Sequence, residues 1–377
     1  MRKRYDSKSL KIISVLLLML VLASCKKDST TQTAKAVVNA TPVQLGVYEQ
    51  SDSIIYKILF MTVTKIGTQT LSEDFNGLVF DTGSGGLVID AEGILPASMI
   101  TSTGFKFTGD STVVDGITIT NQTQTISYGD DANTTDVVYG NLAYAAVTIG
   151  DPSGNIVIKR LPFFIYYKAL DGNGNKLEAH YFDVLGVDPE YDISINNVNI
   201  GSPFMYYDPG TGLTKGFKMA ALGTSNFTDA NEIPLTPGVI TLGLTAADLS
   251  SSSGFTMTQL KYNSDDGADP VIPATINYNN KNVSATVLFD SGTDPDNYIE
   301  DYSASKTITQ LPPSSPVTVA TASGFNYDFT TTSTDYLTLI ENPSTSKTTA
   351  SILSLEYFLN NSYLLDYTDH KLGLKNN

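Results

Sequence analysis

Two short segments of the chain place an aspartate between an apolar run and a glycine turn. Residues 78–84 read LVFDTGS and residues 287–293 read VLFDSGT. Asp81 and Asp290 therefore each follow three apolar residues and precede a hydroxyl residue, a glycine and a second hydroxyl residue. Because burial raises the pKa of a carboxyl group, an aspartate in this position needs hydrogen-bond donors or a chemical role.

The hydroxyl residues around each aspartate can supply those donors. Ser84 and Thr293 lie three residues after Asp81 and Asp290, so each can donate to its own carboxylate across the turn. Thr82 and Ser291 point the other way, so we expect them to brace the two turns against each other. The residues expected to support the two aspartates are Thr82, Gly83, Ser84, Ser291, Gly292 and Thr293.

The chemistry of the two aspartates depends on whether they become neighbours. Two carboxylates a few ångströms apart cannot both ionise freely, so they share one proton. One then acts as a base towards a water molecule, and the other acts as an acid towards a carbonyl. If two halves of the chain pack face to face, Asp81 and Asp290 form such a pair and can hydrolyse a carbonyl compound.

The two segments belong to an internal repeat. VFDTGSGGLVI (79–89) is similar to LFDSGTDPDNYI (288–299), and each copy is followed later by an apolar residue and a small one. In the first half this pair is Leu185–Gly186, and in the second it is Leu353–Ser354. Since 377 residues exceed what one hydrophobic core usually holds, we expect two lobes made by duplication.

The periodicity predicts a mostly β protein. Short apolar alternations recur from about residue 46 and are broken by Gly, Asn and Asp, which is typical of strands and turns. Short helices are expected only at residues 245–251 and 354–362. The clearest strand candidates are residues 54–67, 141–150, 155–167, 238–244, 285–290 and 361–367.

The N-terminal segment predicts export and lipidation. A basic stretch precedes the apolar run IISVLLLMLVLAS, which is too short to span a bilayer but is typical of a signal peptide. LASC, which ends at Cys25, resembles the bacterial lipobox, in which the cysteine is lipidated; the alternative is a plain secretory signal with a chance cysteine. We expect a signal peptide at 1–24, a lipidated cysteine and flexible tether at 25–45, and lobes at 46–235 and 236–377.

Charge and cysteine content limit the partners of the chain. The formal net charge is −16, and residues 1–24 carry five basic groups and one acid, so the mature chain is near −16 − 4 = −20. No basic stripe is visible, which argues against nucleic-acid binding and against adsorption of the folded body to anionic lipid. Cys25 is the only cysteine, so no disulfide is expected. We expect a monomer in the bacterial cell envelope that contacts a membrane only through its lipid anchor.

Other candidate sites have simpler explanations. DGNGNKLE (171–178) begins like a calcium loop but lacks the glycine at position six and the glutamate at position twelve, so a hairpin turn is expected. His180 and His370 have no metal-ligand spacing. No nucleotide-binding loop or GxSxG elbow is present in the sequence. We therefore expect no metal and no organic cofactor.

Taken in order, the motifs resemble those of the pepsin-like aspartic proteases. Beyond the two aspartate segments, QTISYGD (124–130) is similar to the family's flap, and FDVLGV (182–187) is similar to its FDGILGL segment. SILSLEYFLNNSYLLDYTDHKLGL (351–374) is similar to its C-terminal helix and strands. The resemblance runs from about residue 54 to residue 374. It implies a mostly β, bilobal fold with two related β-barrel-like lobes and an active-site cleft between them.

The resemblance also implies roles for individual residues. Asp81 and Asp290 would be the catalytic pair, and Tyr128 and Gly129 would close the flap over an extended peptide. Asp294 follows the second turn, where the family borders its substrate cleft. With Asp296, Glu300 and Asp301, it could make the cleft acidic and favour basic or polar residues near the scissile bond.

The sequence departs from the family pattern in three places. No tryptophan follows DTGS, so the usual partner of the flap tyrosine is missing, and the flap is longer than expected. Ser354 replaces a glycine beneath the second aspartate turn, where its Cβ could shift Asp290.

Together, the two aspartate segments and the resemblance predict an aspartic endopeptidase with a polypeptide substrate. The alternatives are a weak or inactive protein of the same fold that binds peptide or glycan, and an unrelated β-rich domain with chance motifs.

Overall fold

The computed structural model describes residues 40–51, 56–71, 77–129, 135–152, 154–223, 227–228 and 233–377. Residues 39–377 form one compact unit. The signal peptide, Cys25 and most of the tether lie outside the described residues. Within the described part, no helix is long and apolar enough to cross a membrane.

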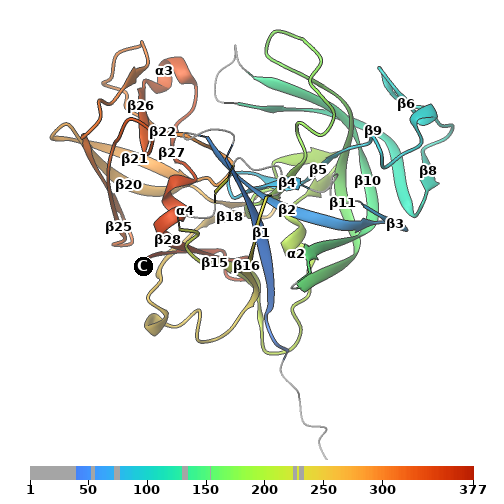
Figure 1. Ribbon diagram of the computed structural model, residues 1–377, viewed down its shortest axis with the longest axis horizontal. Helices are drawn as coiled ribbons and strands as arrows, with labels where there is room; N and C mark the ends of the chain where they lie inside the picture. The colour runs from blue at the N-terminus through green and yellow to red at the C-terminus, as the bar shows by residue number, and fades with distance from the viewer. Residues whose placement is uncertain are drawn as a thin grey trace, which may run out of the picture. The chain divides into compact units, whose positions relative to one another are not determined.

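Strands dominate the described residues, as the periodicity predicted, and they form one sheet of fifteen strands, one of eight and three of two. In Figure 1 the smaller of the two large sheets is on the left and strands β8 to β11 of the larger one are on the right. The larger sheet runs in the order β17 (Thr256–Gln259), β29 (Lys371–Asn376), β28 (Asn361–Asp366), β15 (Thr214–Met219), β16 (Leu235–Leu244), β1 (Val43–Ser51), β2 (Lys57–Ile66), β4 (Gly77–Asp81), β12 (Val184–Val187), β5 (Gly85–Asp90), β11 (Gly154–Leu170), β10 (Asp136–Asp151), β9 (Ile117–Tyr128) and β8 (Ser111–Val114), with β3 (Gln69–Thr70) on β2.

The eight-stranded sheet belongs to the second half of the chain. It runs in the order β23 (Thr309–Gln310), β26 (Leu337–Glu341), β22 (Asp296–Glu300), β27 (Ala350–Leu353), β21 (Lys281–Phe289), β20 (Ile272–Tyr278), β24 (Pro316–Thr321) and β25 (Asn326–Thr330). The two-stranded sheets are β6 (Ile100–Thr101) with β7 (Gly104–Phe105), β13 (Ile193–Ile195) with β14 (Val198–Ile200), and β18 (Lys261–Asn263) with β19 (Gly267–Asp269).

The internal repeat is visible in the strand pairing. β4 ends at Asp81 and runs parallel to β12, which places Gly186 opposite Asp81. β21 ends just before Asp290 and runs parallel to β27, which places Leu353 opposite Phe289. Each aspartate strand therefore lies beside the strand that carries the apolar–small pair of its own half. The pairing supports the duplication that the sequence predicted.

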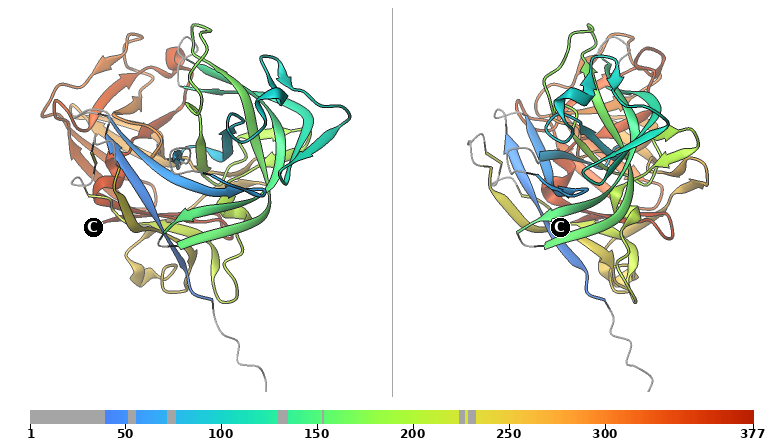
Figure 2. Two further views of the ribbon diagram at one scale, coloured as in Figure 1. Left: turned by 45° about the vertical axis from the view of Figure 1, so that its right-hand side comes forward. Right: turned by 90° about the vertical axis from the view of Figure 1, so that its right-hand side faces the viewer.

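Strand β1 lies between β16 and β2 in the fifteen-stranded sheet. Its first residues correct the predicted boundary between the tether and the folded body. β1 pairs with β16 and with β2, and the blue ribbon of β1 can be followed from two further sides in Figure 2. Val43 lies opposite Leu242, and Leu45 is fully buried. Residues 43–45, which the sequence assigned to the tether, thus belong to the folded body, because they complete a strand and bury an apolar side chain.

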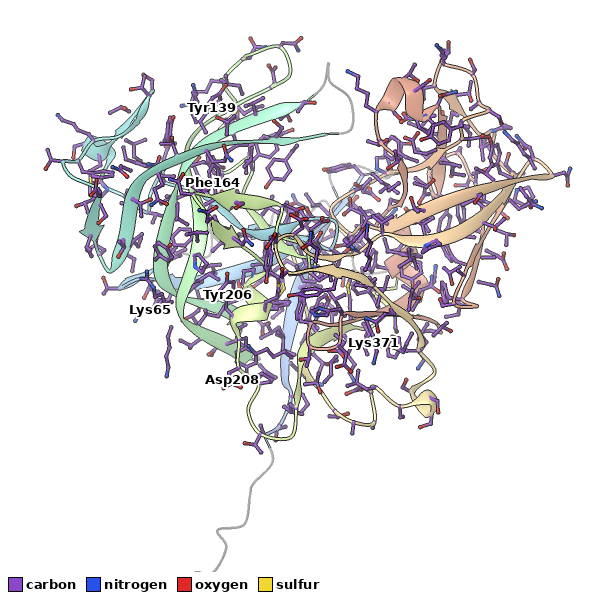
Figure 3. The ribbon with its side chains drawn as sticks, turned by 180° about the vertical axis from the view of Figure 1, so that it is seen from behind. Lys65, Tyr139, Phe164, Tyr206, Asp208 and Lys371 are labelled. Atoms are coloured by element: carbon purple, nitrogen blue, oxygen red, sulfur yellow. The ribbon has the colours of Figure 1, made fainter. Side chains whose placement is uncertain are left out.

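The hydrophobic core places aromatic rings directly beneath both aspartate turns. Phe80, which precedes Asp81, packs against Phe217 and Phe204 with ring centroids 6.1 and 6.4 Å apart. Phe289, which precedes Asp290, packs against Tyr357 at 4.5 Å. All of these rings are buried. A second buried cluster on β10, β11 and β12 includes Phe164, which is labelled in Figure 3. The rings that contact Phe80 and Phe289 thus give each aspartate turn a buried apolar base.

One of the two predicted helices is confirmed and the other is wrong. α4 (Glu356–Asn360) lies within 354–362, but Asn361 already begins β28. Residues 245–251 form turns and the start of a 3₁₀ segment: Thr245 and Asp248 bond to each other as at the start of a helix, but Gly254, with a φ of 85°, ends the segment. Two four-residue helices that the sequence did not predict are α2 (Pro203–Tyr206) and α3 (Pro343–Ser346).

Candidate active site

The two aspartate turns are joined by reciprocal hydrogen bonds. The hydroxyl of Thr82 donates to the carbonyl of Phe289 at 2.8 Å, and the hydroxyl of Ser291 donates to the carbonyl of Phe80 at 2.8 Å. Each hydroxyl also accepts from the other's backbone N–H, at 2.9 and 3.1 Å. Both side chains are buried. The bracing that the sequence predicted is confirmed, and it connects the two large sheets.

Each aspartate is held by its own turn in the same way. Asp81 accepts from the Gly83 N–H at 2.7 Å on Oδ1 and from the Ser84 hydroxyl at 2.5 Å on Oδ2. Asp290 accepts from the Gly292 N–H at 2.8 Å on Oδ1 and from the Thr293 hydroxyl at 2.6 Å on Oδ2. The donors predicted at Ser84 and Thr293 are therefore confirmed. Two bonds orient each carboxylate.

The two carboxylates lie against each other because a glycine stands beside each one. A Cβ on Gly83 would lie 2.4 Å from Cγ of Asp290, and a Cβ on Gly292 would lie 2.7 Å from Cγ of Asp81. Burial raises the pKa of Asp290 well above its ordinary value, and the charge of Asp81 and a hydrogen bond with its side chain raise it further. The pair can therefore hold one proton between two carboxylates at a pH where isolated aspartates are ionised.

Ser354, which replaces a family glycine, fits without a clash. It is fully buried, and both its backbone N–H and its hydroxyl donate to Oδ1 of Asn297, at 2.9 and 3.2 Å. In the first half, by contrast, a Cβ on Gly186 would lie 2.6 Å from the carbonyl oxygen of Ser84. The space beneath the second turn is therefore wider, and Asn297 satisfies the hydroxyl that the serine brings.

The predicted flap is a hairpin of β9 and β10. Tyr128 is the last residue of β9 and pairs with Asp136, and Gly129 follows with a φ of 111°, which favours glycine. The ring of Tyr128 stacks on Phe182, with centroids 5.3 Å apart and planes 10° apart. Phe182 thus packs against the flap tyrosine, a contact that the sequence predicted to be missing because no tryptophan follows DTGS. Residues 130–134, which include the altered flap tip, lie outside the described residues.

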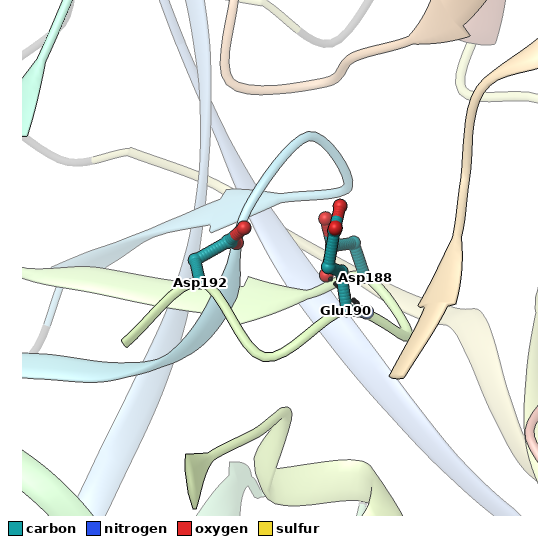
Figure 4. Close-up of side chains that lie close together, drawn as sticks. All are labelled: Asp188, Glu190 and Asp192. Atoms are coloured by element: carbon teal, nitrogen blue, oxygen red, sulfur yellow. Dashed lines mark hydrogen bonds between the residues drawn. The ribbon is translucent and has the colours of Figure 1, made fainter. Parts of the chain in front are cut away.

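Three carboxylates that the sequence did not single out lie beside the first turn. Oxygens of Asp188, Glu190 and Asp192 lie within 4.8 Å of one another (Figure 4). Asp188 donates its backbone N–H to the carbonyl of Ser84 at 3.0 Å, and Asp192 accepts from the Gly85 N–H at 2.5 Å. Burial and the charge of Asp192 raise the pKa of Asp188 and raise that of Glu190 to about 7. Three acidic groups that resist ionisation therefore lie together behind the Asp81 turn.

A lysine occupies the corresponding region of the second turn. Lys57 donates its backbone N–H to Oδ2 of Asp294 at 2.5 Å and its ammonium to Oε1 of Glu356 at 2.6 Å. Burial raises the pKa of Asp294 to about 7. One oxygen of Asp294 therefore binds the protein's own backbone, while the other is buried without a hydrogen-bond partner among the described residues. Its predicted contact with substrate stays a prediction.

The expectation that Glu300 and Asp301 make the cleft acidic is wrong. Both residues are buried, at 4% and 3% exposure. Glu300 accepts from the hydroxyls of Ser346 and Thr348, and Asp301 pairs with Lys281. Glu300 ends β22 and Asp301 follows it, and hydroxyls and an ammonium satisfy the two buried carboxylates.

The turn predicted at residues 171–178 is confirmed, and each histidine contacts a neighbouring side chain. Asp171 folds its own turn by accepting from the backbone N–H groups of Asn173 and Asn175. His180 bonds to Asp183 at 2.9 Å, and His370 stacks on Tyr262 at 3.9 Å. Among the described residues, the cluster of possible metal ligands is Asp188, Glu190 and Asp192, and it includes neither histidine and not Asp171.

Comparison with solved structures shows the fold class. The chain is similar to an aspartic proteinase from Irpex lacteus, with a TM-score of 0.56, 14% identity, and coverage of 89% of this chain and 97% of the other. It is also similar to basic 7S globulin from soybean, with a TM-score of 0.54, 11% identity, and coverage of 89% and 96%. No protein-family model and no curated protein matches the chain. The fold is therefore pepsin-like and mostly β, as the resemblance implied.

Sequence reasoning missed Lys57, Phe182 and the acidic group around Asp188. The sequence DPEYD (188–192) offered a signal, because three acids in five residues directly follow the FDVLGV segment. Lys57 gave none, since one lysine within an apolar strand pattern looks like an ordinary exposed residue. Its partners lie 237 and 299 residues away in sequence.

Proposed function

We propose that this protein is an aspartic endopeptidase that hydrolyses extended polypeptides. The observation that carries the proposal is the pair Asp81 and Asp290, each held by a glycine N–H and a hydroxyl and each lying against the other's turn. Similarity to a solved aspartic proteinase supports it. The fold alone does not decide the activity, because a globulin shares it.

In the proposed reaction the dyad handles one proton. Asp81, whose charge helps to raise the pKa of Asp290, is the base that takes a proton from water. Asp290 carries the shared proton and donates a hydrogen bond to the scissile carbonyl. The water attacks that carbonyl, and the resulting tetrahedral intermediate breaks down as a proton passes to the leaving nitrogen. The hydroxyls of Ser84 and Thr293 keep both carboxylates in place.

Substrate would lie between the dyad and the flap. Closure of Tyr128 and Gly129 over an extended peptide would exclude water and bind its backbone. Burial and then the charge of Asp81 raise the pKa of Tyr128, and this nearness of Tyr128 to Asp81 supports a flap that closes towards the dyad. We further propose lipidation at Cys25 and a place in the bacterial cell envelope, on the basis of LASC and the apolar run before it.

The test is proteolysis by the compact unit, residues 39–377, which includes all of β1. Unfolded protein is offered as substrate from pH 3 to 7, with and without a pepstatin-like inhibitor. We expect inhibitor-sensitive cleavage that Asp81→Asn and Asp290→Asn each abolish. A matched control is Asp171→Asn, because Asp171 bonds only within its exposed turn.

The second candidate is a non-catalytic protein that uses the same region to bind peptide or glycan. The similarity to basic 7S globulin favours keeping it. Absence of cleavage at every pH would support this candidate, whereas cleavage that survives the inhibitor and both aspartate variants would contradict the proposed dyad. Lipidation is tested separately, by mass measurement of the mature N-terminus in the wild type and in Cys25→Ser.

A further inference from the structure

Lys57 makes three contacts with the second half of the chain. It is the first residue of β2, and its side chain is 9% exposed. Its ammonium lies 2.6 Å from Oε1 of Glu356 and 3.4 Å from Oδ1 of Asp335. Its backbone N–H donates to Oδ2 of Asp294 at 2.5 Å. One residue of the larger sheet therefore holds three acidic residues of the other half.

Two of these contacts converge on Thr293. Asp294 follows Thr293 directly in the chain. Glu356 follows Leu355, whose backbone N–H donates to the carbonyl of Thr293 at 2.9 Å. Thr293 in turn donates its hydroxyl to Oδ2 of Asp290 at 2.6 Å. Lys57 thus contacts the residue after Thr293 and the residue after its hydrogen-bond donor Leu355, and Thr293 orients Asp290.

We propose that Lys57 is a positioning residue for the candidate active site, holding Thr293, and through it Asp290, in register with the Asp81 turn. This inference rests on the proposed function for its effect on catalysis. Among the described residues Lys57 bonds to Asp294, Glu356 and Asp335 and to neither carboxylate of the dyad, so it acts through the segment around Thr293 rather than on the substrate.

The charges around Lys57 explain why a lysine is needed there. Burial lowers its pKa, but the hydrogen bond and charge of Glu356, with the charges of Asp294 and Asp335, raise it overall. Glu356 is 1% exposed, and burial raises its pKa even against the opposing effect of Lys57. Without the ammonium, three acidic residues would face one another close to Thr293.

The experiment compares Lys57→Met, Lys57→Arg and the double variant Lys57→Met/Glu356→Gln in the full chain. We expect Lys57→Met to lower kcat about tenfold to a hundredfold, as a misplaced catalytic group does. KM should stay within about twofold, because Lys57 does not bind substrate. Lys57→Arg should retain most of the wild-type kcat. The double variant removes the unpaired charge and should fold as the wild type does, yet its kcat should stay low.

The matched control is Lys218→Met, because Lys218 also pairs with an aspartate, Asp248 at 2.5 Å, but contacts neither turn. We expect its kcat to equal that of the wild type. A kcat within twofold of wild type in both Lys57→Met and the double variant would overturn the proposal. So would an equal loss in Lys218→Met.

A readout independent of catalysis separates this proposal from the proposed function. Carboxyl ¹³C NMR follows the protonation of Asp290 in each folded variant. The hydrogen bond from Thr293 lowers the pKa of Asp290. Loosening this bond should therefore raise the proton affinity of Asp290 about threefold in Lys57→Met and in the double variant. If the wild type proves inactive but this shift occurs, the positioning role stands and the protease function fails. An unchanged titration in both variants contradicts the positioning role.

Discussion

The turns that carry Asp81 and Asp290 hold their carboxylates with the same set of bonds, but acidic residues gather alone behind the first turn and around a lysine behind the second. Each aspartate accepts from a glycine N–H and from a hydroxyl three residues on. Behind the first turn lie three carboxylates, which belong to none of the ion pairs among the described residues. Behind the second turn the carboxylate of Glu356 is paired with the ammonium of Lys57.

The difference indicates that bond geometry and charge balance are set by separate parts of the fold. The bonds come from the repeated motif itself, so both copies have them. The surroundings come from segments outside the motif, namely residues 188–192 at the first turn and β2 with α4 at the second.

The largest expected effect is shared by both turns. Gly83→Ala and Gly292→Ala each place a Cβ within 2.7 Å of the opposite aspartate, so the two carboxylates must separate. We expect each variant to lower kcat/KM about a hundredfold or more. Gly77→Ala is the control, since its Cβ would lie 3.3 Å from the Phe60 ring, far from the dyad. A large loss of kcat/KM in only one of the two variants would contradict the equivalence of the two turns.

The second prediction concerns the charge balance at the Asp290 turn. Lys57→Met leaves Glu356 buried without its cation, so we expect the free energy of unfolding at pH 7 to fall by about 3 kcal/mol. Burial raises the pKa of Glu356, so lowering the pH protonates it, and the loss should shrink as the pH falls. Denaturant titrations at pH 7 and pH 4 measure both values. An equal loss at the two pH values would contradict the assignment to Glu356.

The third prediction concerns the brace that the turns share. Thr82→Val and Ser291→Ala each leave a buried carbonyl and a buried N–H of the opposite turn without a partner. We expect each to lower the free energy of unfolding by about 2 kcal/mol. Because both changes disrupt one network, the double variant should lose less than the sum of the two. Strict additivity would show that the turns are stabilised independently.

The smallest effect should have the opposite sign and belong to the Asp81 turn alone. Burial and neighbouring carboxylates raise the pKa of Glu190 from 4.5 to about 7, so the folded state holds this proton more tightly than the unfolded state. Its charge therefore costs stability as the pH rises from 4.5 through 7. After allowance for solvent screening, Glu190→Gln should stabilise the protein by about 1 kcal/mol at pH 8 and leave it unchanged at pH 4. Glu178→Gln, at an exposed position, is the control.

The sequence predicted those parts of the site that depend on local spacing. The hydroxyl three residues after each aspartate, the brace between Thr82 and Ser291, and the hairpin ending at Tyr128 all follow from short motifs and strand patterns. The mostly β fold follows from the same patterns. Each of these features needs only residues within one turn or one repeated pair of turns.

The rest depends on contacts between residues distant in the chain. Lys57 contacts Glu356, and Phe182 contacts Tyr128, only once the strands are paired. The acidic tail after the second turn looked like one exposed group, but Glu300 and Asp301 are buried against partners elsewhere in the second half. Ser354 looked like a defect because its partner, Asn297, lies on another strand. Such pairings have no local signal in a single sequence.

The central claim is that Asp81 and Asp290 share a proton, and titration of Asp290 tests it most directly. Carboxyl ¹³C NMR of the wild type and of Asp81→Asn compares the pKa of Asp290 with and without its neighbour's charge. Burial contributes in both proteins, but the charge of Asp81 contributes only in the wild type. We predict a raised pKa for Asp290 in the wild type and a clear fall in Asp81→Asn. An identical titration in the two proteins would contradict the shared proton.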